Sequence, residues 1–173
     1  MAQIKKKDRT QYIWKLIMAG GVLTLLSLVL PSAFFIESGV WGLLWYIGIL
    51  WGGDIYGGEV IGFIDDGRYI PIGVITTVLL IIALILMAIS ARNTKKERNF
   101  KLNAGISFLG SILAIIGPIV YYFYLDAEIP VLFWDHFLPF VGVFLPLIAS
   151  ILGIISAIML VSATKLGSKS GER

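Results

Sequence analysis

The only histidine of the chain, His136, directly follows Asp135. A histidine beside a carboxylate can act as a general base towards a nucleophile, and a histidine can also bind a metal. No nucleophile stands in a recognisable catalytic motif, and one histidine cannot build an ordinary histidine-rich metal site. We therefore interpret His136 as a polar side chain at a membrane interface, and we expect no enzymatic activity and no metal site.

Acidic residues gather between positions 36 and 70, where carboxylate oxygens could bind a hard cation such as Ca²⁺. The acids in question are Asp54, Glu59, Asp65 and Asp66. Their spacing matches no calcium-binding loop, and a solvated loop is where acids are expected. The chain also has no cysteine, which excludes disulfides and thiolate ligands. We expect no cofactor.

Transport chemistry usually places an ionisable residue within the membrane. The apolar stretches of this chain contain none in their interior, and the deepest charge, Lys15, can extend towards the membrane surface. Pro118 and Pro146 fall inside apolar stretches and could mark a broken helix at a binding site. More often such prolines only kink a helix, and we favour that interpretation.

Hydrophobic residues make up 58% of the sequence, and charges are confined to short segments between long uncharged stretches. A spanning helix needs roughly 20 apolar residues. We expect an all-α membrane protein, a bundle of four transmembrane helices over residues 13–35, 71–91, 102–125 and 137–164. The first stretch could instead be a signal peptide, but its apolar part is longer than is usual for one.

The basic residues indicate which side of the membrane each segment occupies. Thirteen of the fourteen lie in residues 1–15, 92–101 and 165–173, whereas Arg68 lies between the first two spans. Positively charged segments stay in the cytoplasm. We expect a multi-pass plasma-membrane protein with a cytoplasmic N-terminus (1–12), middle loop (92–101) and tail (165–173), and with extracellular loops at 36–70 and 126–136. The basic residues flank apolar spans, so we expect no nucleic-acid binding.

The large outer loop, 36–70, carries Trp41, Trp45 and Trp51 among many glycines. Aromatic and β-branched residues favour strands, and the pair Asp66-Gly67 is typical of a turn. We predict a small β-structure or irregular cap on the outer membrane surface, with a short interfacial helix over residues 40–51 as the alternative. Three tryptophans imply burial at the interface or contact with a protein partner, and we take them as candidate partner-binding residues.

Small residues predict where the helices pack. Ala149, Gly153 and Ala157 recur every four residues, a pattern that lets two helix backbones approach closely. Ser107 and Ser111 line one stripe of the preceding span. We expect these residues to pack within the bundle, and a surface left over could support a homo-oligomer.

The middle loop carries five cations that can attract anionic lipid headgroups. These candidate lipid-binding residues are Arg92, Lys95, Lys96, Arg98 and Lys101.

The four spans, the large first outer loop and the short second one resemble the claudin-like tetraspan group. Within the loop, Trp41 followed by Gly42-Leu43-Leu44-Trp45 is similar to that group's tryptophan and Gly-Leu-Trp signature, and Arg68 is similarly placed before the second span. The chain lacks that group's cysteine pair and has a shorter loop. The resemblance implies a surface adhesion or assembly role that rests on a β-rich outer loop, and we do not extend it to junction formation.

The sequence therefore favours a non-enzymatic scaffold, adhesion protein or accessory subunit that contacts a membrane-protein partner through its tryptophan-rich loop. The alternative is a small channel or transporter with an acidic outer vestibule. Only scattered serine, threonine and asparagine residues could line a polar path, which makes this alternative the weaker one.

Overall fold

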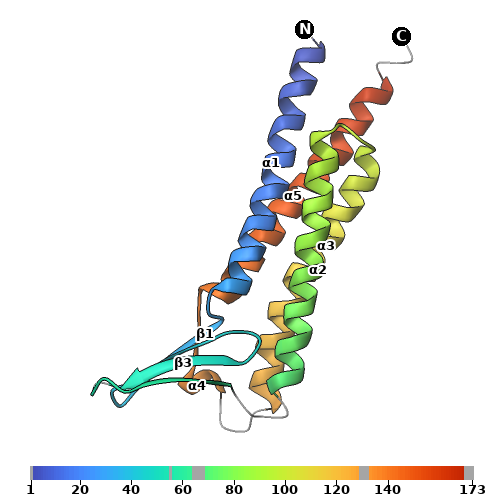
Figure 1. Cartoon of the computed structure of the whole chain (residues 1–173). Coiled ribbons are helices and arrows are strands. Elements are labelled where there is room, and N and C mark those ends of the chain that lie inside the picture. Colours follow the sequence, from blue (N-terminus) through green and yellow to red (C-terminus); the bar gives the residue numbers. More distant parts are fainter. Residues whose placement is uncertain (1, 55, 64–68, 129–132, 170–173) are drawn as a thin grey trace.

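Figure 1 shows the computed structural model of the protein, which describes residues 2–54, 56–63, 69–128 and 133–169. Four of the described helices are long and apolar enough to cross a membrane, over Gln11–Val29, Tyr69–Lys95, Phe100–Ala127 and Val141–Thr164. The predicted fold class, a four-helix membrane bundle with a small β-structured loop, is confirmed. The elements in chain order are α1 (Ala2–Val29), β1 (Ala33–Glu37), β2 (Val40–Leu44), β3 (Ile49–Asp54), β4 (Glu59–Phe63), α2 (Tyr69–Lys95), α3 (Phe100–Glu128), α4 (Phe133–His136), β5 (Leu138–Pro139) and α5 (Val141–Lys169).

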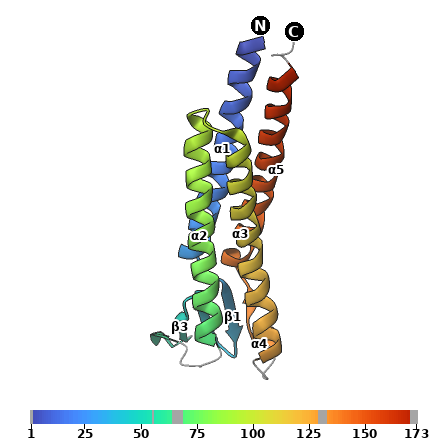
Figure 2. The ribbon, with the colours of Figure 1, turned by 90° about the vertical axis from the view of Figure 1, so that its right-hand side faces the viewer.

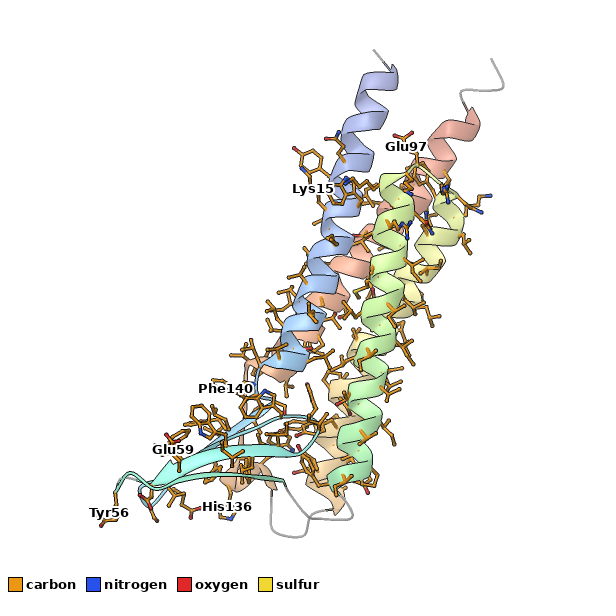
Figure 3. All side chains as sticks on the ribbon, in the orientation of Figure 1. Lys15, Tyr56, Glu59, Glu97, His136 and Phe140 are labelled. Carbon is orange, nitrogen blue, oxygen red and sulfur yellow. The ribbon has the colours of Figure 1, made fainter. Side chains whose placement is uncertain are left out.

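The four long helices run side by side, and each packs against two neighbours. Helices α1 and α3 both contact α2 and α5. Figures 1 and 2 place both chain termini at one end of this bundle, and Figure 3 places Glu97, in the turn between α2 and α3, at that same end. We call this the terminus end and the opposite one the sheet end. An even number of crossings follows from this arrangement.

Helix α1 ends earlier in the chain than predicted. The expected span continued to residue 35, but α1 ends at Val29 and strand β1 begins at Ala33. Pro31 explains the break, because a proline has no backbone N–H and keeps the preceding residue out of helical conformation. The fourth span, expected from Phe137, begins at Val141, since β5 comes directly before it.

The segment between α1 and α2 forms an antiparallel sheet, and β5 joins it from the segment before α5 in the order β4-β3-β2-β1-β5. The prediction of β-structure is confirmed, and the alternative helix over 40–51 is wrong because these residues form β2, a turn and the start of β3. Ser38 and Gly39 both have positive φ, 50° and 83°, as a two-residue hairpin turn requires. The predicted turn at Asp66-Gly67 lies outside the described residues.

Two buried clusters hold the molecule together. The cluster towards the terminus end includes Ile17, Met87 and Leu160. The cluster towards the sheet end joins Leu44 of the sheet to Tyr121 and other residues of the helices. The sheet and the bundle therefore share one core.

Candidate interaction surface

The two faces of the sheet look in opposite directions. Strand register places Phe34, Leu43, Trp51 and Ile61 in one row across β1 to β4, and side chains two positions away share their face. Phe34 contacts Phe140, with ring centroids 5.9 Å apart. Figure 3 shows Phe140 between the sheet and the end of α1, so we call this the bundle face.

The opposite face, which we call the far face, carries Glu37 and Val40 on the projecting part of the sheet, and at its base Ala33 and Leu44, which are buried in the core shared with the helices. The Nδ1 atom of His136 lies 3.1 Å from a carboxylate oxygen of Glu37. Figure 3 shows His136 on the side of the sheet away from the end of α1. The sequence placed His136 only beside Asp135, whereas the structure places the exposed carboxylate of Glu37 against it. The side chain of Asp135 lies outside the described residues.

The three tryptophans predicted to bind a partner do not share one environment. Trp41 and Trp51 lie on the bundle face, where their rings meet edge to face with centroids 5.3 Å apart. Trp51 is 36% exposed. Trp45 follows β2, and its indole N–H donates to the carbonyl of Val29 at 2.7 Å. Because Val29 is the last residue of α1, this bond satisfies one of the carbonyls that a helix end leaves open. Trp45 thus ties the sheet to the bundle.

Buried hydroxyl groups join the sheet to α2 and α3. The hydroxyls of Tyr69 and Tyr121 lie 2.6 Å apart, and that of Ser32 lies 3.2 Å from Tyr121. Tyr69 donates to the carbonyl of Trp45 at 3.0 Å. Ser32 donates its hydroxyl proton to the carbonyl of Leu44 at 2.9 Å, so the Tyr121 hydroxyl is the donor that remains for its contacts with Tyr69 and Ser32. Tyrosines near the ends of spanning helices often contact lipid headgroups, but Tyr69 and Tyr121 are both fully buried.

Tyr46 completes this junction from the turn between β2 and β3. Its hydroxyl donates to the carbonyl of Gly142 at 3.1 Å, and its ring meets that of Tyr121 with centroids 4.8 Å apart. Burial, and after it the neighbouring Tyr121, raises the pKa of Tyr46 above its ordinary value. A Cβ atom on Gly73 would collide with the carbonyl oxygen of Tyr46. The sequence signal for this contact was the glycine near the start of the second span.

The outer edge of the sheet is strand β4. Among the described residues, no strand pairs with β4 on the side away from β3. Asp54 donates its backbone N–H to Gly58 at 3.0 Å, and hydrogen-bonded pairs alternate along an antiparallel ladder. Glu59 and Ile61 are therefore not hydrogen-bonded to β3 and direct their backbone groups outward. Ile61 is also 76% exposed.

The small residues predicted to pack helices lie inside the bundle, and Gly153 of α5 contacts α3. Ser107 donates to the carbonyl of Gly153 at 3.1 Å, and a Cβ atom on Gly153 would collide with Oγ of Ser111. Ala149 and Ala157 are buried as well. Gly153 thus meets both predicted serines of α3, whereas the carbonyl oxygen of Ala149 lies 3.0 Å from where a Cβ on Gly20 of α1 would stand.

The basic residues predicted to bind lipid headgroups lie at the terminus end. Lys95 extends over the ring of Trp14 on α1, with Nζ 4.9 Å from the ring centroid. Asn103 donates to the carbonyl of Arg98 at 2.6 Å and so orders the turn. The predicted residues Arg92, Lys95, Lys96, Arg98 and Lys101 are all exposed.

The acidic residues whose carboxylates could bind a hard cation do not form a cluster in the described part of the chain. Asp54 accepts backbone N–H groups of Tyr56 and Gly58 at 2.8 and 3.1 Å, which is a turn-forming role. Asp65 and Asp66 lie outside the described residues. No group of three potential metal ligands occurs among the residues that were described.

A groove of about 320 Å³ lies between α3 and α5 towards the sheet end. Both helices continue through their prolines, Pro118 and Pro146, and Pro118 lines the groove. The remaining lining is apolar and aromatic, with Tyr122 as its most polar side chain.

These features define a four-span α-helical membrane protein that carries a five-stranded antiparallel sheet at one end of its bundle. No protein-family model matches the chain, and no curated protein matches it.

Proposed function

We propose that this protein is a non-enzymatic scaffold, adhesion protein or accessory subunit of a membrane complex, and that it binds a protein partner through the free edge of its sheet. The observation that carries this proposal is the outer strand β4, whose Glu59 and Ile61 direct backbone groups away from β3. A strand edge of this kind accepts an extended segment of another chain. The resemblance to claudin-like tetraspan proteins also supports partner binding through the sheet, because it implies an assembly role for a β-rich outer loop.

The tryptophan loop contributes to this function by building the sheet. Trp45 holds the sheet against α1, and Trp41 on β2 contacts Trp51 on the neighbouring strand β3. Direct contact of Trp41, Trp45 and Trp51 with the partner stays a prediction. Substituting Trp45 would also disturb the junction with Val29, so partner binding is better tested at the sheet edge.

We further propose that the sheet end is extracellular and that the protein resides in the plasma membrane. The three basic segments of the chain support this orientation, since positive segments remain in the cytoplasm. Because the chain has no cysteine, a single introduced thiol reports its own side. A membrane-impermeant maleimide applied to intact cells should label Tyr56→Cys, and should label Lys96→Cys only after permeabilisation. The reverse pattern would overturn the orientation.

The described interior does not favour the channel alternative. Buried hydroxyls bond to backbone carbonyls, such as Thr24 to Gly20 at 2.9 Å and Ser90 to Asn103 at 2.9 Å. Figure 3 shows Glu59 on the projecting part of the sheet, away from the bundle. An acidic vestibule over the bundle therefore has no support from this residue.

The partner proposal is tested with Ile61→Pro in the full-length protein. Proline removes the outward N–H of the edge and leaves the bonds between β3 and β4 in place. The matched control, Ile61→Val, keeps both the N–H and a β-branched side chain. After mild-detergent purification, we expect the partner to be lost from Ile61→Pro and kept by Ile61→Val. Full partner recovery with a correctly folded Ile61→Pro protein would refute binding through this edge.

A further inference from the structure

The bundle face and the far face of the sheet differ in chemistry. On the bundle face, Ile36, Trp51 and Ile61 are exposed, at 67%, 36% and 76%. On the projecting part of the far face, Glu37 has a side chain that is 62% exposed and lies next to His136, and the exposed hydrophobic residue there is Val40, a smaller side chain that is 42% exposed. A sheet surrounded by water on both sides has no reason to keep its exposed tryptophan and isoleucines on one face.

The position of the sheet indicates what covers the bundle face. Figure 1 shows the sheet projecting sideways from the sheet end of the bundle, past the end of α1. Phe140 lies on the bundle side of the sheet, so this face looks back towards the level of the membrane-spanning helices. Trp45, by its bond to Val29, fixes the base of the sheet to the residue where the first candidate span ends.

The lipid-facing surface of α1 continues towards the bundle face. Val22, Leu25 and Val29 are exposed along this helix, and Val29 is the last of them before the sheet. An apolar helix surface inside a bilayer is covered by hydrocarbon, and the next layer outward is the headgroup interface. Tryptophan favours this layer, because its ring is apolar and its indole N–H is polar.

We propose that the bundle face lies on the interfacial layer of the same bilayer that the helices cross, with Ile36, Trp51 and Ile61 inserted among the headgroups. Glu59, the described carboxylate of this face, stands at the start of the edge strand, where headgroup water can hydrate it. The far face then meets water at Glu37 and Val40, whereas at its base Ala33 and Leu44 are buried in the core shared with the helices. The sheet lies along the membrane surface, and its free edge points sideways within the plane of the membrane. This inference needs no partner and is independent of the proposed function.

The test uses single nitroxide labels on the cysteine-free chain, with one protein copy in each phosphatidylcholine nanodisc. The matched pair is Ile36→Cys and Glu37→Cys, which are adjacent and comparably exposed but lie on opposite faces. Ile61→Cys is a second bundle-face site. Leu25→Cys is the reference for hydrocarbon, and Tyr56→Cys, at the hairpin between β3 and β4, is the reference for water. Collisions with oxygen, which dissolves in lipid, and with a water-soluble nickel complex are measured at each site.

Labels at positions 36 and 61 should collide severalfold less with the nickel complex than the label at 37, while oxygen collisions stay high as at position 25. Equal nickel accessibility at 36 and 37 would overturn the inference. Low accessibility to both reagents at 36 and 61 would also overturn it, because that result means burial against protein. Partner binding by Ile61→Pro and Ile61→Val, and label accessibility at positions 36 and 37 with one protein copy in each nanodisc, are separate measurements, so the two proposals fail separately.

Discussion

Replacing Gly153 by alanine should test how closely α3 and α5 approach. The added Cβ would collide with Oγ of Ser111 and would lie 3.4 Å from the methyl group of Met87. The same residue accepts the hydrogen bond of Ser107 through its carbonyl, at 3.1 Å. Forcing a methyl group into a filled contact costs roughly 1–3 kcal/mol. In the other direction, alanine is more favourable than glycine inside a helix by about 1 kcal/mol. We therefore expect Gly153→Ala to destabilise the fold by up to about 2 kcal/mol.

The structure offers a matched control and a rescue. Gly105 also lies in a helix, α3, and a Cβ there would meet no atom within 4 Å. Gly105→Ala should therefore stabilise the protein by up to about 1 kcal/mol. Adding Ser111→Ala to Gly153→Ala removes the colliding oxygen and leaves the Ser111 Cβ at 3.3 Å. The double variant should recover at least about 1 kcal/mol relative to the sum of the two single changes.

The measurement is equilibrium unfolding of the purified protein in mixed micelles, with SDS as denaturant and intrinsic tryptophan fluorescence as signal. Each variant yields a free energy of unfolding relative to the wild type. A Gly153→Ala protein as stable as Gly105→Ala would show that α3 and α5 do not touch here. Additive effects in the double variant, within about 0.5 kcal/mol, would show that Ser111 is not the obstacle.

Three further predictions concern the junction between sheet and bundle and use the same titration. Tyr121→Phe loses the hydroxyl that bonds to Tyr69 and one more neighbour, so it should lower the free energy of unfolding by roughly 1–3 kcal/mol. Stability should be constant at neutral pH and fall above about pH 10, because burial holds the folded-state pKa of Tyr46 above its unfolded value of 10.0, and Tyr46→Phe should reduce that fall. Trp45→Phe keeps an aromatic ring but loses the bond to Val29, which should cost about 1 kcal/mol; an unchanged midpoint would mean that Val29 finds another donor.

The spans could be predicted because hydropathy is a local property of the chain. The sheet was also foreseeable in part, since Trp41 to Leu44 and their neighbours favour strands. Its fifth strand was not, because β5 has two residues and pairs with Ala33 and Phe34, which are more than a hundred positions away. A strand that short carries no periodicity, and only the tertiary fold brings it to β1.

The buried tyrosines escaped prediction for a different reason. A tyrosine at the end of a spanning helix has the same sequence signal whether it faces headgroups or protein. Tyr69 and Tyr121 face protein because the sheet supplies partners for their hydroxyls, namely the carbonyl of Trp45 and the side chain of Ser32. Which side of a helix the sheet covers is decided by long-range packing, so the aromatic pattern could locate these residues along the membrane normal but not their surroundings.

The sheet is held against the bundle from several directions, and this fixes its tilt. Trp45 bonds to the end of α1, Tyr46 bonds to the start of α5, and Tyr69 reaches the sheet from the start of α2. The absent side chain of Gly73 lets the Tyr46 carbonyl touch α2 directly. A sheet attached at one point could rotate about that point, but attachments to three different helices prevent such rotation. The angle between the sheet and the bundle is therefore fixed. The bundle face, with Ile61 on it, is then held at a constant depth relative to the membrane that the helices cross.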